Sequence, residues 1–157
     1  MKWILLILVC LGTYDGFAQA RRLPGDVRYS PLLDKGSQVT DVQVQQAKSL
    51  LESIETGIAE GDISSFSKCF DKQVFVNITK GESGYFSSNQ TSSLLHHYIA
   101  SRKIVSFKFS RLNEKGISPY ATGRLVTLYR GSQESAQVYV SCSWQDSRWV
   151  IGQFNIY

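Results

Sequence analysis

The chain has 157 residues, of which 17 are basic and 13 acidic, so its formal net charge is +4 at pH 7. About 43% of the residues are hydrophobic, which is enough for one packed core at this length. No run of five or more like charges occurs, and this argues against a basic tail of the kind that binds nucleic acid. We therefore expect a mildly basic globular protein with no nucleic-acid partner.

The first twenty residues have the pattern of an export signal. Lys2 supplies a positive charge, residues 3–11 form an unbroken apolar run, and Ala18 and Ala20 are small residues of the kind that a signal peptidase requires. The run has nine residues, whereas a membrane-spanning helix needs about 20. We expect cleavage after Ala20, no stable membrane insertion afterwards, and a periplasmic or secreted protein.

A lipid-anchored protein is the alternative, because Cys10 lies inside the apolar run. Lipoprotein signals place small residues before the modified cysteine, whereas Leu8 and Val9 are bulky. The sequence therefore favours cleavage after Ala20 over acylation.

Removal of the signal would leave two cysteines, Cys69 and Cys142. Exported proteins can keep disulfides, but both residues lie at positions that the hydrophobic pattern assigns to the core. We expect two buried free thiols, with a disulfide between Cys69 and Cys142 as the alternative. A nucleophilic cysteine would need a base beside it, and no sequence pattern supplies one.

The domain is predicted to begin with two helices. Residues 21–43 contain prolines and glycines without periodicity, which predicts an extended arm before a domain at 44–157. Apolar residues then recur at helical spacing over 47–58, and Gly61 is a typical C-terminal stop. Asp62 would cap a second, shorter helix. The apolar side of that second helix consists of Ile63, Phe66 and Phe70.

From residue 74 the hydrophobic period changes from helical to alternating, which predicts a short strand at 74–78. A glycine-containing loop at 81–84 follows. Ser87 and Gln90 have the spacing of a capping box and predict the start of a third helix. The apolar side of this third helix consists of Leu94, Leu95, Tyr98 and Ile99.

Three or four long strands are predicted to complete the chain. The alternating runs are 104–112, 120–129, 135–144 and 149–157. Helices followed by an antiparallel meander predict an α+β domain with its helices packed on one side of the sheet. The residues expected to share a face are Val105, Phe107 and Phe109; Val138, Val140, Cys142 and Trp144; and Val150, Phe154 and Ile156.

This order of elements resembles the nuclear-transport-factor-2-like fold, also called cystatin-like. In that fold a cone-shaped, curved antiparallel sheet wraps around three N-terminal helices. The pieces that carry the resemblance are EGDI (60–63), GYFS (84–87), YATGRL (120–125), VYV (138–140), and WVI with QF (149–154). They are also similar to a group of small exported bacterial proteins of unassigned function. The resemblance implies a fold and an export route but no reaction.

Enzymes of the superfamily that the chain resembles work in the mouth of the cone, typically with an inward carboxylate or histidine and a tyrosine. The predicted strands contain no Asp, Glu or His. The weak catalytic candidates that remain are Asp71, Tyr85 and Tyr98. Asp71 is better explained as a strand-start cap, and the tyrosines as core aromatics with a hydrogen-bonded hydroxyl.

The only histidines of the chain are His96 and His97. Neighbours on a helix point about 100° apart, so both cannot bind one metal as residues four apart could. We expect both at the surface, and we predict no metal and no cofactor.

Two arginines in strands, Arg111 and Arg124, are the candidates for ligand binding together with Tyr120. Arg124 is expected to share a face with Tyr120, and Arg111 to share a face with Phe107 and Phe109. A guanidinium on a concave apolar face would require an anionic ligand or a buried partner. On the outer face, the same side chains would simply be solvated.

The leading hypothesis is an exported, non-enzymatic domain that binds a partner protein or a small ligand through the cone or the outer face of the sheet. The alternative is a small-molecule enzyme of the ketosteroid-isomerase-like type that uses the cone mouth. A homodimer through the sheet is a further expectation. Converging polar groups in a deep cavity would favour the enzyme, and a filled cone with an exposed apolar sheet face would favour binding.

Overall fold

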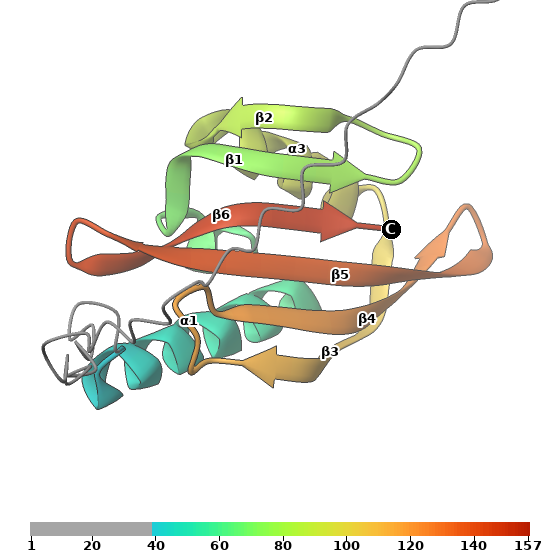
Figure 1. Ribbon diagram of the computed structural model, residues 1–157. Coiled ribbons are helices and arrows are strands. Elements are labelled where there is room, and N and C mark those ends of the chain that lie inside the picture. Colours follow the sequence, from blue (N-terminus) through green and yellow to red (C-terminus); the bar gives the residue numbers. More distant parts are fainter. Residues whose placement is uncertain (1–38) are drawn as a thin grey trace, which may run out of the picture. The chain divides into compact units, whose positions relative to one another are not determined.

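The computed structural model describes residues 39–157, and every structural statement below refers to them. The predicted export signal, Cys10 and most of the predicted arm lie outside this range. Within it, no helix combines the length and apolar character needed to cross a bilayer. In chain order the elements are α1 (Asp41–Glu60), α2 (Ser64–Ser67), β1 (Phe70–Ile78), β2 (Ser83–Ser87), α3 (Ser88–Ala100), β3 (Lys103–Asn113), β4 (Tyr120–Tyr129), β5 (Ser132–Gln145) and β6 (Arg148–Ile156) (Figure 1).

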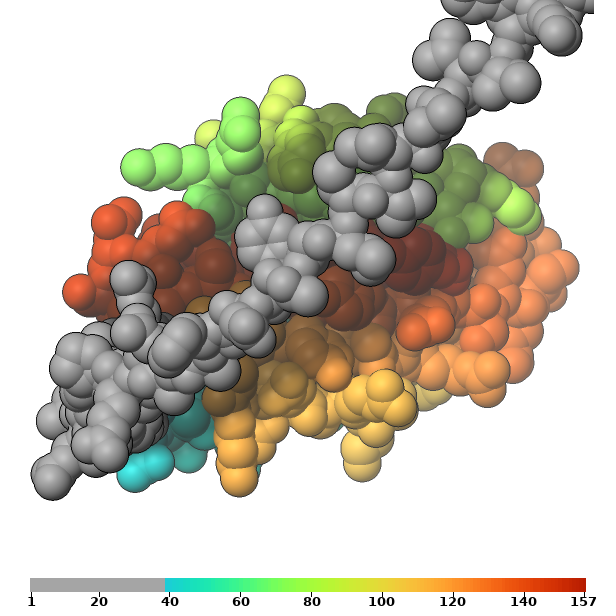
Figure 2. All heavy atoms as spheres, in the orientation of Figure 1, coloured from blue at the N-terminus to red at the C-terminus, as the bar shows by residue number. Residues whose placement is uncertain are grey.

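Six strands form one curved sheet in the order β2-β1-β6-β5-β4-β3. Helices α1 and α3 lie behind the sheet in Figure 1. We call the side of the sheet that faces away from these helices the outer face, and Figure 2 views the molecule from that side. The predicted α+β domain with helices on one side is confirmed. The prediction of a fully antiparallel sheet is wrong at one pair, because β1 and β6 run parallel. These two strands are far apart in the chain, so no hairpin forces them to be antiparallel.

Helix α1 has a defined start and a defined end. Thr40 and Gln43 form a capping box at its start. Gly61 follows its end with a φ of 78°, a left-handed conformation that glycine adopts without strain, as predicted. The helix starts at Asp41, so the last three residues of the predicted arm at 21–43 belong to the helix. The buried residues of α1 are Ala47, Leu50, Leu51, Ile54, Gly57 and Ile58.

The predicted second helix is only a single turn. Its N-cap is Ile63 and not the predicted Asp62, although Asp62, one residue earlier, accepts a hydrogen bond from the Ser64 N–H at 3.0 Å. The Ile151 N–H donates to the Cys69 carbonyl at 2.7 Å and so ties this segment to β6. The first strand therefore starts at Phe70, four residues before the predicted start, and Phe70 contacts Phe66 from the strand instead of from a helix.

Irregularities in β3 change which residues face the core. The register with β4 shifts between Ile104 and Ser106, and again between Phe109 and Arg111. Each extra residue moves the alternation by one position. Phe107 and Phe109 are buried as predicted, whereas Val105 is 52% exposed, which corrects its predicted place on their face.

A register shift between β5 and β6 has a similar effect. Ile151 lies opposite Cys142 and joins the core, while Val150 lies opposite Ser143 and is buried outside the main cluster. The predicted face of Val150 was therefore wrong. Trp144 keeps the predicted face, opposite Trp149, but lies at the margin of the core: its side chain is 36% exposed and rests edge-on against Trp149.

The concave side of the sheet is filled by apolar side chains. The rings of Phe66 and Phe154 stack with their centroids 6.2 Å apart. The innermost space is lined by Ile58, Ile63, Leu95, Ile99, Leu125, Val138, Phe154 and Ile156. This space has no room for a water molecule. The interior of the domain is therefore a packed core, and a binding site has to lie at its margin or on its outside.

Gly123 lies where β4 passes close to β3. A Cβ atom at this position would lie 2.5 Å from the Lys108 carbonyl oxygen and 3.0 Å from the Phe109 Cα. Because both are backbone atoms of the paired strand, the strands would have to separate. We expect Gly123→Ala to lower the free energy of unfolding by about 1–3 kcal/mol, measured by urea denaturation.

The matched control for Gly123→Ala is Gly152→Ala. A Cβ atom at Gly152 would have no neighbour within 4 Å, so this variant should change the free energy of unfolding by no more than about 0.5 kcal/mol. Equal losses in the two variants would contradict the account of the β3–β4 contact.

Candidate functional site

A hollow of about 750 Å³ lies where α3 ends. It is bordered by the turn between β1 and β2 and by the ends of β4, β5 and β6, and we call it the α3 pocket. The volume is in the range of small-molecule sites. Its apolar wall includes Ile78, Leu94 and Ala136, and its polar residues include Thr127 and Tyr98.

Arg102 is the central charged residue of the α3 pocket. It follows α3 directly, and its side chain is only 16% exposed. The carbon of its guanidinium lies 3.8 Å from the ring centroid of Tyr98 and 4.5 Å from that of Tyr129. Both contacts are within cation–π range. The two rings therefore fix the position of the charge inside the pocket.

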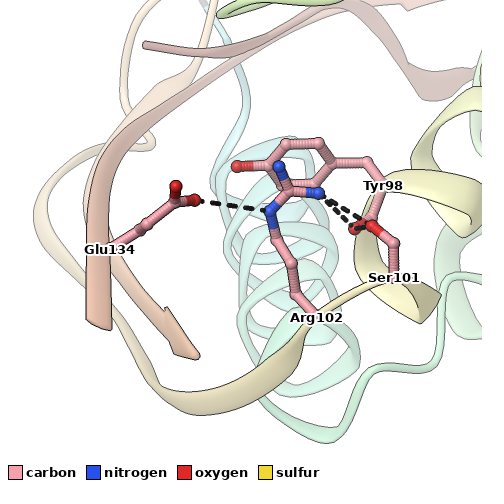
Figure 3. A network of polar contacts seen from close by, with 4 residues as sticks. All are labelled: Tyr98, Ser101, Arg102 and Glu134. Carbon is pink, nitrogen blue, oxygen red and sulfur yellow. Dashed lines mark hydrogen bonds and ion pairs between the residues drawn. The ribbon is translucent and has the colours of Figure 1, made fainter. Parts of the chain in front are cut away.

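Arg102 also caps the C-terminal end of α3 (Figure 3). Its Nη1 donates to the Tyr98 carbonyl at 3.1 Å and to the Ser101 hydroxyl at 2.8 Å. The last carbonyls of a helix have no hydrogen-bond donor within the helix, and Arg102 supplies one to the Tyr98 carbonyl. The Nη1 side of the guanidinium is therefore used to hold the end of α3 and is not free for a ligand.

The opposite edge of Arg102 is not satisfied. Its Nε is buried and has no hydrogen-bond partner among residues 39–157. Glu134 Oε2 faces it at 3.8 Å, which makes an ion pair but is too long for a hydrogen bond (Figure 3). A buried donor without an acceptor lowers stability by about 1–3 kcal/mol. The α3 pocket thus contains a fixed charged donor that a ligand can satisfy.

Burial raises the pKa of the Tyr98 hydroxyl, Arg102 acts in the opposite direction, and Glu134 adds to the increase. The phenol therefore stays protonated at neutral pH and can donate a hydrogen bond. Because proton transfer is efficient when the pKa of the group lies near the working pH, Tyr98 is poorly suited to act as a general base.

The family of the protein follows from its sequence. A family profile described as "Domain of unknown function (DUF4783)" matches residues 51–157, which is more than half of the chain. The chain belongs to the DUF4783 family. A search among curated proteins gave no match.

Solved structures agree with this assignment. The DUF4783 chain is similar to a DUF4783 family protein from Bacteroides uniformis ATCC 8492, with 18% identity, a TM-score of 0.60 and coverage of 67% of this chain and 93% of that one. A DUF4783 family protein from Bacteroides fragilis YCH46 is 15% identical with a TM-score of 0.58, and the match covers 66% of this chain and 93% of that one. An NTF2-like protein of unknown function from Pseudomonas putida KT2440 is 11% identical with a TM-score of 0.58, and the match covers 76% of this chain and 87% of that one. The resemblance to the nuclear-transport-factor-2-like fold is therefore confirmed.

The DUF4783 structure does not bring the three catalytic candidates together. Asp71 lies in β1 and accepts a hydrogen bond from Gln145 Nε2 at 2.8 Å. Tyr85 is 73% exposed beside Phe75, so its predicted place in the core was wrong. Only Tyr98 lies in the α3 pocket. The three residues cannot act together on one small substrate.

The three ligand-binding candidates lie on the outer face of the DUF4783 sheet. Arg124 is exposed and pairs with Lys108 and Gln137 across the neighbouring strands. Arg111 lies opposite Thr122 on the same face. Its predicted alignment with Phe107 and Phe109 is wrong, because the irregularity after Phe109 reverses the alternation.

Tyr120 completes this outer face, where its ring stacks on Tyr139 with a centroid distance of 6.1 Å. Aromatic side chains thus lie on the solvent side of the sheet, where Tyr120 and Tyr139 are half-buried and Tyr85 is exposed. The homodimer expected through the sheet would use this face, and it stays a prediction.

Sequence reasoning missed both Arg102 and Glu134. Arg102 lies in the turn between α3 and β3, where no alternation assigns a face. Glu134 lies one residue before the predicted strand at 135–144, whereas β5 starts at Ser132. One signal was available: Tyr98 and Arg102 are four residues apart, so they lie on one side of a helix that continues for a turn.

Of the remaining candidates of the DUF4783 domain, His97 lies at the rim of the α3 pocket, and the others lie elsewhere. His96 and His97 are exposed, as predicted. Within residues 39–157, no three residues of the types His, Cys, Asp and Glu form a cluster that could hold a metal. Cys69 and Cys142 are free thiols in the structure, and Cys142 is buried.

Proposed function

We propose that this DUF4783 protein is an exported, non-enzymatic domain that binds a small ligand in the α3 pocket. The observation that carries the proposal is Arg102, which lines a hollow of about 750 Å³ and whose buried Nε has no acceptor among residues 39–157. A ligand acceptor at this position would remove the cost of the unpaired donor. The pattern of the first twenty residues supports export.

Two features favour binding over catalysis. Asp71 and Tyr85 lie outside the α3 pocket, so the pocket contains only Tyr98 of the three catalytic candidates. Burial also raises the pKa of the Tyr98 hydroxyl, which makes it still less able to act as a base at neutral pH. The polar groups of the pocket are suited to holding a ligand in one orientation.

The proposal is tested by filling the α3 pocket with Ala136→Trp. Ala136 lies in the pocket wall on β5 and is only partly buried, so the indole has space in the hollow. We expect native mass spectrometry of the wild-type protein from its own cells to show a bound small molecule that Ala136→Trp lacks. The same spectrum should show a chain that begins at Arg21.

The control for Ala136→Trp is Gln137→Trp, which places the same side chain on the outer face at the next position of β5. This variant should keep the ligand, and thermal unfolding should show that both variants are folded. Retention of the ligand by folded Ala136→Trp would contradict binding in the α3 pocket, and a chain that begins at Met1 would contradict export.

A further inference from the structure

We propose that the ligand of the α3 pocket carries a carboxylate and that Arg102 binds it. This inference rests on the proposed function, because it names the chemistry of the ligand in the same pocket. It follows from the shape of the free edge of Arg102, from the position of Glu134 and from the composition of the pocket wall.

The free edge of Arg102 has a definite geometry. Nη1 is bonded to the end of α3, while Nε has no acceptor. The rings of Tyr98 and Tyr129 lie near the guanidinium, at 3.8 and 4.5 Å from its carbon. The edge left for a ligand is therefore the one formed by Nε and Nη2, in the guanidinium plane. Because Nε is buried in this structure, a ligand reaches this edge only when Glu134, which faces it at 3.8 Å, turns away. A planar carboxylate matches this edge with two parallel hydrogen bonds.

Glu134 shows that a carboxylate can approach this edge. Its Oε2 lies 3.8 Å from Nε, and its side chain is 44% exposed. Only the Glu134 half of this ion pair is exposed, and at 3.8 Å the pair contains no hydrogen bond. Such a loose pair is weak, so Glu134 can turn into solvent at little cost. A ligand carboxylate that moved closer would replace the loose ion pair with charge-assisted hydrogen bonds. Glu134 would then compete with the ligand for Arg102.

The rest of the α3 pocket suits an organic acid with a small apolar body. Ile78, Leu94 and Ala136 offer an apolar wall beside Arg102. The other charged residues in the lining, Lys80 and Glu82, are exposed on the turn between β1 and β2 and have opposite signs. The pocket therefore has one buried cationic group, whereas a phosphate would be better served by several donors at once.

The test is a titration of benzoate and its neutral analogue benzamide, followed by NMR shifts of pocket amides in the full mature protein. Two ligand hydrogen bonds to a charged donor should make benzoate bind roughly ten- to a hundredfold more tightly than benzamide. Arg102→Gln should abolish this preference. Glu134→Gln should strengthen benzoate binding several-fold and leave benzamide binding unchanged. Arg124→Gln, on the outer face, is the matched control and should behave as the wild type.

Arg102 caps α3, so Arg102→Gln could fail to fold, and Arg102→Lys is therefore the second test variant. It keeps the positive charge but lacks the planar edge, so it should lose most of the preference for benzoate. Equal affinities for benzoate and benzamide, both abolished by Ala136→Trp, would overturn the carboxylate assignment and leave ligand binding in the pocket standing. Tighter binding of inorganic phosphate than of benzoate would also overturn the assignment. If the pocket bound neither benzoate nor benzamide, the carboxylate assignment would also be overturned. If, in addition, the protein isolated from its own cells carried no ligand, the proposed function would fail as well.

Discussion

Phe154→Ala should be one of the most destabilising single substitutions in this domain. Phe154 is 1% exposed, lies in β6 between Val76 and Val140, and stacks on Phe66 with a centroid distance of 6.2 Å. Removing a buried phenylalanine ring loses its transfer free energy and leaves a cavity, at a total cost of about 3–5 kcal/mol. Urea denaturation measures this loss, and it is a large share of the roughly 5–15 kcal/mol that stabilises an ordinary domain.

The control for Phe154→Ala is Tyr85→Ala. Tyr85 is 73% exposed on the outer face, and surface substitutions usually change the free energy of unfolding by no more than about 0.5 kcal/mol. A loss in Phe154→Ala below about 1.5 kcal/mol would contradict a single core that is closed around the Phe66–Phe154 stack.

Alkaline pH should destabilise the fold through Cys142. Burial raises the pKa of this thiol from 9.0 to about 12, and the nearby Cys69 adds to the shift. In the unfolded chain the thiol ionises near its ordinary value, so the folded state holds the proton more tightly. The resulting stability is fully present below pH 9 and is lost as the pH rises toward 12. The expected loss is about 1.4 kcal/mol per pH unit, or about 4 kcal/mol in all.

Other groups also titrate above pH 9, so the readout is the difference in pH slope between the wild type and Cys142→Ala. The free energy of unfolding should fall less steeply with pH in Cys142→Ala. The slope should differ by up to about 1.4 kcal/mol per pH unit, which is the contribution of one proton. Val140→Ala, also in β5 and buried, is the control: it should lower stability at every pH without changing the slope. Identical slopes in the wild type and Cys142→Ala, or a Cys69–Cys142 disulfide in the purified protein, would contradict a buried free thiol.

Local patterns in the sequence were enough to predict most elements of the fold. The capping box of Ser87 and Gln90 marks the start of α3, and the alternation over 120–129 gives β4 with both of its bounds. These signals are local, because caps and alternation depend on neighbouring residues. The fold family could be predicted for the same reason, from the order and type of the elements.

The faces of single residues could not be predicted where strands are irregular. Val105 and Arg111 each lie next to a register shift in β3, and the shift is a property of the pairing with β4. One extra residue reverses every later assignment along the strand. This is why Arg111 was expected beside Phe107 and Phe109, although it lies on the outer face.

The α3 pocket could not be predicted for a related reason. Arg102 and Glu134 are 32 positions apart in the sequence, and they meet only because the end of α3 lies beside the start of β5. The chemistry itself could be predicted, since a strand guanidinium on an apolar face requires an anion or a buried partner. Arg111 and Arg124 were the candidates because alternation predicts the faces of strand residues, whereas Arg102 lies in a turn that has no alternation.

The central claim is that the α3 pocket is a ligand site in which Arg102 provides the principal donor. A crystal structure of the protein isolated from its own cells tests it most directly. We predict electron density for a small molecule in the pocket, with an acceptor atom about 2.7–2.9 Å from Arg102 Nε and with Glu134 turned away. Density on the outer face near Arg124, together with an Arg102 that is hydrogen-bonded only to protein and water, would contradict the claim.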